Sequence, residues 1–150
     1  MSETRNITFR IKEISTLEFS IKNIPEGISL DADNFKFDVI PQLFIEAKKN
    51  IGFNTTINVL MGKDNPVLIC TLLTRIAYEI INFEEFINPQ DSNSIMIPDQ
   101  FVQTLLSISL STSRGILAAK TEGTILKNIY MPVMNPTGFK AKTIENALSQ

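Results

Sequence analysis

The sequence has no histidine and only one cysteine, Cys70. Without histidine the chain lacks the commonest general base and the commonest metal ligand, and it cannot form a serine–histidine–aspartate triad. A single thiol excludes an internal disulfide and a zinc site built from cysteine and histidine within one chain. The six glycines are scattered and form no phosphate-binding loop. We therefore expect no catalytic residues, no metal and no cofactor.

Long apolar runs and a strong charge are also missing. No apolar run approaches the roughly 18 to 20 residues that span a bilayer, and the start, MSETRNITF, lacks the basic and apolar blocks of a secretory signal. The formal net charge is −2 and the only basic cluster is Lys48–Lys49, so the chain offers nucleic acid little counter-charge. We expect a cytoplasmic protein that neither inserts into membranes nor binds nucleic acid.

Alternating apolar and polar residues predict four β-strands in the first half of the chain. Glu13 and Ser15 interrupt the apolar face of the first strand, which predicts a twist or a bulge in mid-strand. Pro41 lacks the N–H that a central strand needs, so the second strand is expected at a sheet edge or broken there. Short turns such as GKDNP favour antiparallel pairing. The predicted strands span residues 7–22, 35–47, 50–62 and 66–83.

The stretch LSISLSTS (106–113) alternates like a strand, but a longer helical pattern includes it. Pro98 and Asp99 suit the start of a helix, and Gly123 suits its end. The predicted helix therefore spans residues 98–123, with one continuous stripe at helical spacing. The residues of this stripe are Phe101, Leu105, Ile108, Thr112, Gly115 and Ala119.

A second face of the predicted helix has small side chains, and it has two interpretations. The face is either exposed to solvent, or it allows another helix to approach closely, as small residues do between packed helices. Arg114 lies in the middle of this helix and, in a buried setting, should find a carboxylate or carbonyl partner. The candidate oligomer-interface residues are Thr104, Ser107, Ser111, Arg114 and Ala118.

The end of the chain is apolar but contains prolines. The segment TILKNIYMPVMNPTGF (124–139) is expected to lie extended across other structure. The segment KAKTIENALSQ (140–150) is expected to form a short helix, because Ile144 and Leu148 are one turn apart. The segment INPQDSNS (87–94) is expected to be a loop.

These elements predict a single α+β domain, residues 1–150, in which a four-stranded antiparallel sheet is followed by a long helix and a short C-terminal helix. The strands occupy about 7–86 and the helices about 98–150. One helix on one sheet leaves apolar surface uncovered. That surplus indicates oligomerisation or partner binding.

Five segments occur in a characteristic order: ITFRIKEISTLEFSI at the start, VLIC (67–70), Ile97–Pro98, SRG (113–115) and MPVMNP (131–136). In this order they resemble the SecB export chaperones. The resemblance implies a SecB-like fold in which sheets join across a dimer. It also implies a homotetramer, a dimer of dimers, with long helices between two sheets. The function it implies is ATP-independent holding of unfolded polypeptide clients in apolar grooves.

The resemblance, together with the apolar faces, indicates which residues line such grooves, and core packing is the alternative for each of them. Aromatic and flexible side chains suit a groove that accepts many sequences. The candidate client-binding residues are Phe35, Phe37, Val39, Phe53, Tyr78, Ile80, Met131, Val133, Ile144 and Leu148.

The export chaperones dock onto the translocase motor SecA through an acidic sheet face on the first and fourth strands. The resemblance assigns Glu18 and Ile69 to this docking face, whereas Lys22 and Thr71 stand where acids are expected. A SecB-like chaperone dedicated to one partner, such as the antitoxin of a toxin–antitoxin pair, is therefore an alternative. A small-ligand or enzymatic domain that uses carboxylates is a third hypothesis.

Overall fold

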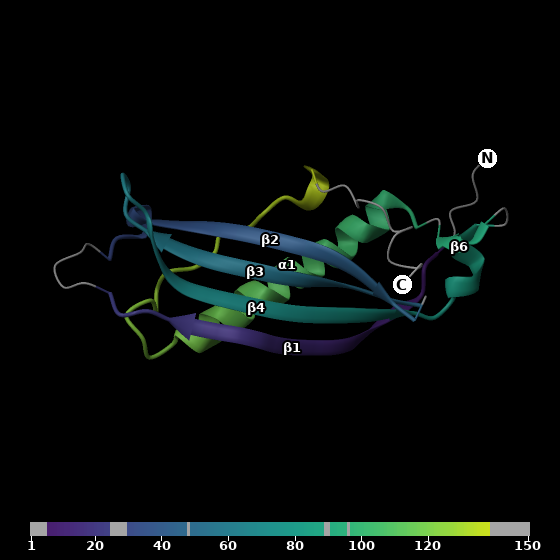
Figure 1. Cartoon of the computed structure of the whole chain (residues 1–150), viewed down its shortest axis with the longest axis horizontal. Helices are drawn as coiled ribbons and strands as arrows, with labels where there is room; N and C mark the ends of the chain where they lie inside the picture. Colours follow the sequence, from purple (N-terminus) through teal and green to yellow (C-terminus); the bar gives the residue numbers. More distant parts are fainter. Residues whose placement is uncertain (1–5, 25–29, 48, 89–90, 96, 139–150) are drawn as a thin grey trace.

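The four predicted strands form one antiparallel sheet in the order β1-β4-β3-β2, as the computed structural model shows (Figure 1). Consecutive strands β2, β3 and β4 pair as hairpins, and β1 adds to the outer edge of β4. The strands are β1 (Phe9–Ile21), β2 (Phe35–Glu46), β3 (Asn50–Met61) and β4 (Val67–Ile80). The structure describes residues 6–24, 30–47, 49–88, 91–95 and 97–138.

Two local expectations about the strands are confirmed. Pro41 lies in β2, which forms one edge of the sheet, where a missing N–H costs no ladder hydrogen bond. The pairing of β1 with β4 slips between Ile11 and Glu13, where the apolar alternation breaks, and again between Thr16 and Glu18. β1 is therefore bulged, as the sequence predicts.

Helix α1 (Asp99–Thr121) covers one face of the sheet, and Figure 1 shows it crossing the strands obliquely. The predicted stripe is only partly right, because Gly115 and Ala119 are exposed. The buried face lies next to that stripe. It contains two serines, which a search for apolar residues does not find. Its residues are Val102, Leu105, Leu106, Ser109, Leu110, Ser113, Leu117 and Thr121.

The buried serines hydrogen-bond to the sheet. Ser109 Oγ lies 2.7 Å from the Tyr78 hydroxyl, which also donates to the carbonyl oxygen of Leu105 at 3.2 Å. Ser113 Oγ lies 2.8 Å from Thr74 Oγ1. Two hydroxyl pairs thus fix the helix on β4, since buried polar groups are costly without partners.

The core lies between α1 and the sheet, and its centre is aliphatic and aromatic. Cys70 belongs to this core, and burial raises the pKa of its thiol to about 11. The reactive thiolate is therefore scarce near neutral pH. The largest fully buried side chains are Tyr78, Phe53, Ile51, Ile57, Met61, Ile69, Leu72, Ile76, Ile80, Leu105, Leu106 and Leu126.

The opposite face of the sheet is largely polar, and Arg75 holds the centre of its ion pairs. The Arg75 guanidinium forms ion pairs with Glu13 at 2.9 Å and with Glu46 at 2.6 Å. It also lies 3.9 Å from the centroid of the Phe44 ring, a cation–π geometry. Arg75 thereby links β4 to β1 and β2 across the solvent face.

The connection from β4 to α1 differs from the predicted loop. It contains a 3₁₀ turn, η2 (Phe83–Phe86), and a short hairpin of β5 (Ile87–Asn88) and β6 (Asp91–Ile95). Strands of two and five residues are too short to produce a readable alternation.

After α1, Gly123 adopts a positive φ of 82°, as a helix-terminating glycine does. The chain then passes through turns and an extended stretch to a 3₁₀ turn, η3 (Pro136–Gly138). Leu126, Ile129 and Met131 are buried in the core, so this segment packs on the rest of the fold as expected. The predicted C-terminal helix lies outside the described residues. None of the described helices has the length and apolarity needed to cross a bilayer.

Candidate functional site

An apolar groove lies between the edge strand β2, helix α1 and the segment that precedes η3. Its volume is about 260 Å³. The side-chain amide of Gln103 donates to the carbonyl oxygen of Thr137 at 3.2 Å, which ties η3 to α1 beside the groove. The groove is lined by Val39, Pro41, Leu106, Leu110, Met134, Asn135 and Pro136.

The walls of the groove combine rigid and adaptable side chains. Leu106 and Leu110 are one helical turn apart on α1, and they line the groove together with Val39 and Pro41 of β2. Met134 is 41% exposed and has three rotatable side-chain bonds, which allow it to adopt different conformations at the groove. A volume of this size has room for a few apolar side chains and not for a folded domain.

The structure divides the predicted client-binding residues between groove, core and surface. Val39 lines the groove, Phe37 is half-buried on the same face of β2, and Val133 is 84% exposed beside Met134. Those placed in the core of the protomer are Phe35, Phe53, Tyr78, Ile80 and Met131. Ile144 and Leu148 lie outside the described residues.

Sequence reasoning missed Leu106, Leu110, Met134 and Pro136. The two leucines repeat at a helical interval, but many other pairs in α1 do so as well. Met134 and Pro136 belong to the MPVMNP segment, whose position against β2 depends on how the chain returns along α1 (Figure 1). The packing of this segment against β2 depends on residues far apart in the sequence, so no pattern within the segment predicts it.

The predicted small-residue face of α1 points away from the sheet. Thr104, Ser107 and Ser111 are exposed there, and Arg114 and Ala118 are half-buried. The expected carboxylate or carbonyl partner of Arg114 is not found within the described part of the protomer. The Arg114 guanidinium instead donates a long hydrogen bond, 3.4 Å, to Ser111 Oγ.

A shallow pocket of about 270 Å³ continues this face past the end of α1. Ala118, Ala119 and Tyr130 line it, and Tyr130 has 62% of its surface exposed. Glu122 and Lys127 supply a charge of each sign at its rim. The small side chains leave the helix backbone accessible to close packing by another element.

The two residues assigned to motor docking have different surroundings. Glu18 is exposed on β1, and Ile69 is buried in the core cluster. Lys22 is exposed just past the end of β1. On this edge of the protomer the accessible charges are therefore of both signs.

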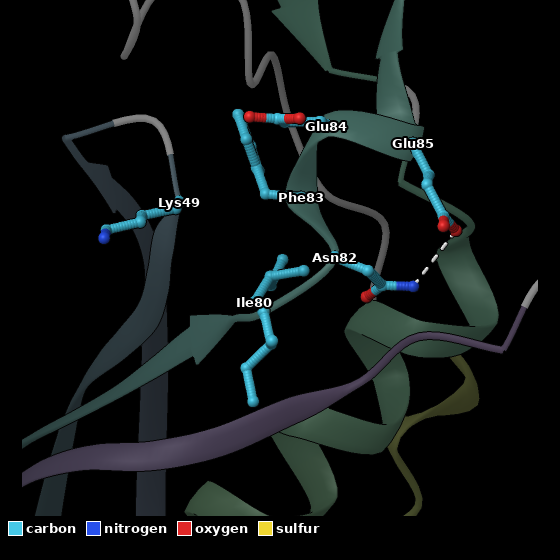
Figure 2. A pocket seen from close by; sticks show the side chains of 7 residues that line it. Lys49, Ile80, Asn82, Phe83, Glu84 and Glu85 are labelled. Atoms are coloured by element: carbon cyan, nitrogen blue, oxygen red, sulfur yellow. Dashed lines mark hydrogen bonds between the residues drawn. The ribbon is translucent and has the colours of Figure 1, made fainter.

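A third pocket, of about 340 Å³, lies where β4 runs into η2 (Figure 2). Figure 2 shows Lys49 on one side of it, Glu85 on the opposite side and Glu84 between them beside Phe83. Asn82 has a structural role, because its side-chain amide donates to the Asn6 carbonyl oxygen at 2.8 Å and to the Glu85 carboxylate at 3.2 Å. Within the described ranges no three potential ligands of the His, Cys, Asp and Glu type gather to hold a metal ion.

The chain has the fold of the SecB-like chaperones. The SecB-like chaperone Rv1957 of Mycobacterium tuberculosis, solved in complex with a ChAD peptide from the Rv1956 HigA1 antitoxin, aligns with a TM-score of 0.51. That alignment covers 84% of this chain and 87% of Rv1957, with 7% sequence identity. A Streptococcus agalactiae protein of unknown function aligns more weakly, with a TM-score of 0.39 and 14% identity over 87% of this chain and 99% of that one. No family model matches the sequence, and no curated protein matches it.

Proposed function

We propose that this protein is an ATP-independent chaperone that binds unfolded or extended polypeptide segments. The observation that carries the proposal is an open apolar groove in a SecB-like fold, bounded by Val39, Leu110 and Met134. An unfolded chain presents scattered apolar side chains, and burying each of them in a groove contributes about 1.5 to 3 kcal/mol. No nucleotide chemistry is needed for binding of this kind.

One groove of this size binds weakly by itself. A few buried side chains barely offset the loss of translational and rotational freedom on association, which costs roughly 4 to 15 kcal/mol. Several grooves in one particle would bind a long client together and raise the apparent affinity by about 10²- to 10⁴-fold. We therefore include assembly in the proposal, as a homo-oligomer that is a dimer of dimers.

The exposed face of α1 supports assembly. Ser107 and Ser111 leave room for close packing by a second copy, and Tyr130 offers a large exposed ring farther along the helix, beside Ala118 and Ala119. Replacing Ser111 by leucine is expected to lower the particle mass, because an oversized side chain separates the packed helices.

The mass is measured by light scattering at micromolar concentration, with far-ultraviolet circular dichroism to check the fold of each variant. Lys63→Leu is the matched control, since Lys63 is exposed in the turn between β3 and β4. An unchanged mass for Ser111→Leu would contradict packing through this face.

The groove is tested by Met134→Glu. A carboxylate in an apolar groove must lose its hydration when a guest binds, so the affinity for a permanently unfolded, carboxymethylated protein should fall about tenfold or more. Ile40→Glu is the matched control, because Ile40 is similarly exposed, 43% against 41%, but lies on the other face of β2. Affinity is measured by fluorescence anisotropy without ATP, and equal effects of the two substitutions would argue against the groove.

A dedicated partner is the second candidate function. It is favoured by the antitoxin peptide bound to Rv1957, a protein of the same fold. A dedicated chaperone would bind one cognate segment and ignore a panel of unrelated unfolded proteins. Similar affinities across the panel would instead support general client binding.

A further inference from the structure

Within the described ranges, strand β2 pairs along one of its edges and leaves the other free. It pairs with β3 continuously, from Phe35 opposite Met61 to Glu46 opposite Asn50. Among the described residues, no other strand pairs with its second edge. The free edge runs alongside the groove, because Val39 and Pro41 form one of the groove walls.

Pro41 identifies which residues turn their main chain toward this edge. It lies opposite Thr55 inside an unbroken ladder, and proline is tolerated there only if the missing N–H would point away from β3. The direction of main-chain groups alternates along a strand, so residues an even number of positions from Pro41 share its orientation. The N–H and C=O groups of Phe37, Val39 and Leu43 therefore point to the free edge.

The side chains of these residues lie on the groove side of β2. Phe37, Val39 and Leu43 are half-buried, whereas Lys36 and Asp38 are exposed on the other face. A guest strand paired with this edge would place every second side chain in the groove. Its remaining side chains would lie next to Lys36 and Asp38, where opposite charges are favourable and like charges are not.

We propose that the groove takes its guest as an added β-strand along β2. The preferred guest is an extended segment with apolar residues at alternate positions and, between them, an acid beside Lys36 and a base beside Asp38. Main-chain hydrogen bonds give affinity for many sequences, and the alternation gives selectivity. This inference rests on the proposed function and states the form in which the polypeptide binds.

Pro41 sets a limit to the added strand. The guest carbonyl that would meet the Pro41 nitrogen finds no donor, so the new ladder is interrupted in the middle of the edge. The same interruption protects a long exposed edge from pairing indefinitely with other copies. β2 thus accepts short guests without acting as a template for aggregation.

The test uses a nine-residue synthetic peptide with valine at odd positions and glutamate and lysine alternating between them. One version carries N-methyl groups on its three central valines, and another carries them on three of its four charged residues, at positions 4, 6 and 8. Each methyl group removes one main-chain donor and blocks close approach on one edge only. A peptide of the same composition with its valines contiguous is the control for simple apolarity.

Binding of each peptide to the full chain is measured by fluorescence anisotropy. Strand addition predicts that one methylated version loses about tenfold or more in affinity while the other stays within about twofold of the parent. Loss with the methylated valines would indicate antiparallel pairing, and loss with the methylated charged residues would indicate parallel pairing.

Other results overturn the inference. If the two methylated versions have the same affinity, the groove recognises apolar side chains and not strand geometry. The same conclusion follows if the peptide with contiguous valines binds as tightly as the alternating peptide. If the alternating peptide fails to bind while unfolded protein binds, strand addition is wrong and the chaperone function stands. If neither binds, the proposed function itself fails.

Discussion

The Gly52→Ala substitution is expected to lower the free energy of unfolding by about 3 kcal/mol or more, because it overpacks a tight site. Gly52 lies in β3, and a Cβ there would meet the carbonyl oxygen of Ile76 and lie 2.9 Å from Ala77 Cα on β4. It would also lie 2.5 Å from Cζ of Phe44. A ring can move aside, but the backbone of a central strand cannot move without breaking its ladder.

The loss is measured by urea unfolding, and it corresponds to a fall in Tm of roughly 6 to 12 °C for a chain of this size. Gly115→Ala is the matched control, because no atom lies within 4 Å of a Cβ added there. In helix α1 that substitution should raise stability by about 0.5 to 1 kcal/mol. The two Gly→Ala changes therefore have opposite expected signs, and a neutral Gly52→Ala would contradict the close packing of β3 on β4.

A double variant separates the two contacts at Gly52. If the Phe44 ring carries the clash, adding Phe44→Leu should restore most of the lost stability. If the contact with the Ile76 carbonyl dominates, the double variant should be no more stable than Gly52→Ala, since Phe44 also stacks on Arg75 in the native sheet. The second result is expected.

The strands and the helix were predictable because their signals are local. Alternation over twelve or more residues locates each long strand, and Pro41 indicates an edge through its own missing N–H. The buried face of α1 was not predictable in the same way. Ser109 and Ser113 look like surface residues, and only their partners Tyr78 and Thr74, 31 and 39 residues away, show why they are buried.

The candidate site was predictable in part for a related reason. The period of two places Val39 and Phe53 on the same face of the sheet, but it does not tell which part of that face the helix covers. The oblique path of α1 and the return of the chain to Pro136 decide this, so Val39 lines a groove and Phe53 is covered. Both depend on contacts between distant segments.

Phe53 tests whether a residue predicted to bind clients belongs to the core instead. The Phe53→Ala substitution is expected to lower the free energy of unfolding by about 3 to 5 kcal/mol. The side chain is 0% exposed on β3, opposite Leu43 on one side and Ile76 on the other. Its removal leaves a cavity under α1 rather than a wider groove. The loss is measured by urea unfolding against the parent.

Phe53→Leu supplies a variant that keeps most of the core volume and folds for binding studies, since exchanges of similar volume usually cost below about 1.5 kcal/mol. If Phe53 is a core residue, this variant should bind unfolded protein within about twofold of the parent, whereas Met134→Glu loses about tenfold. The reverse pattern, full stability for Phe53→Ala with weakened binding for Phe53→Leu, would place Phe53 in the guest-binding surface. It would then follow that α1 moves away from the sheet when a guest binds, because no fixed arrangement buries this ring fully and also presents it to a partner.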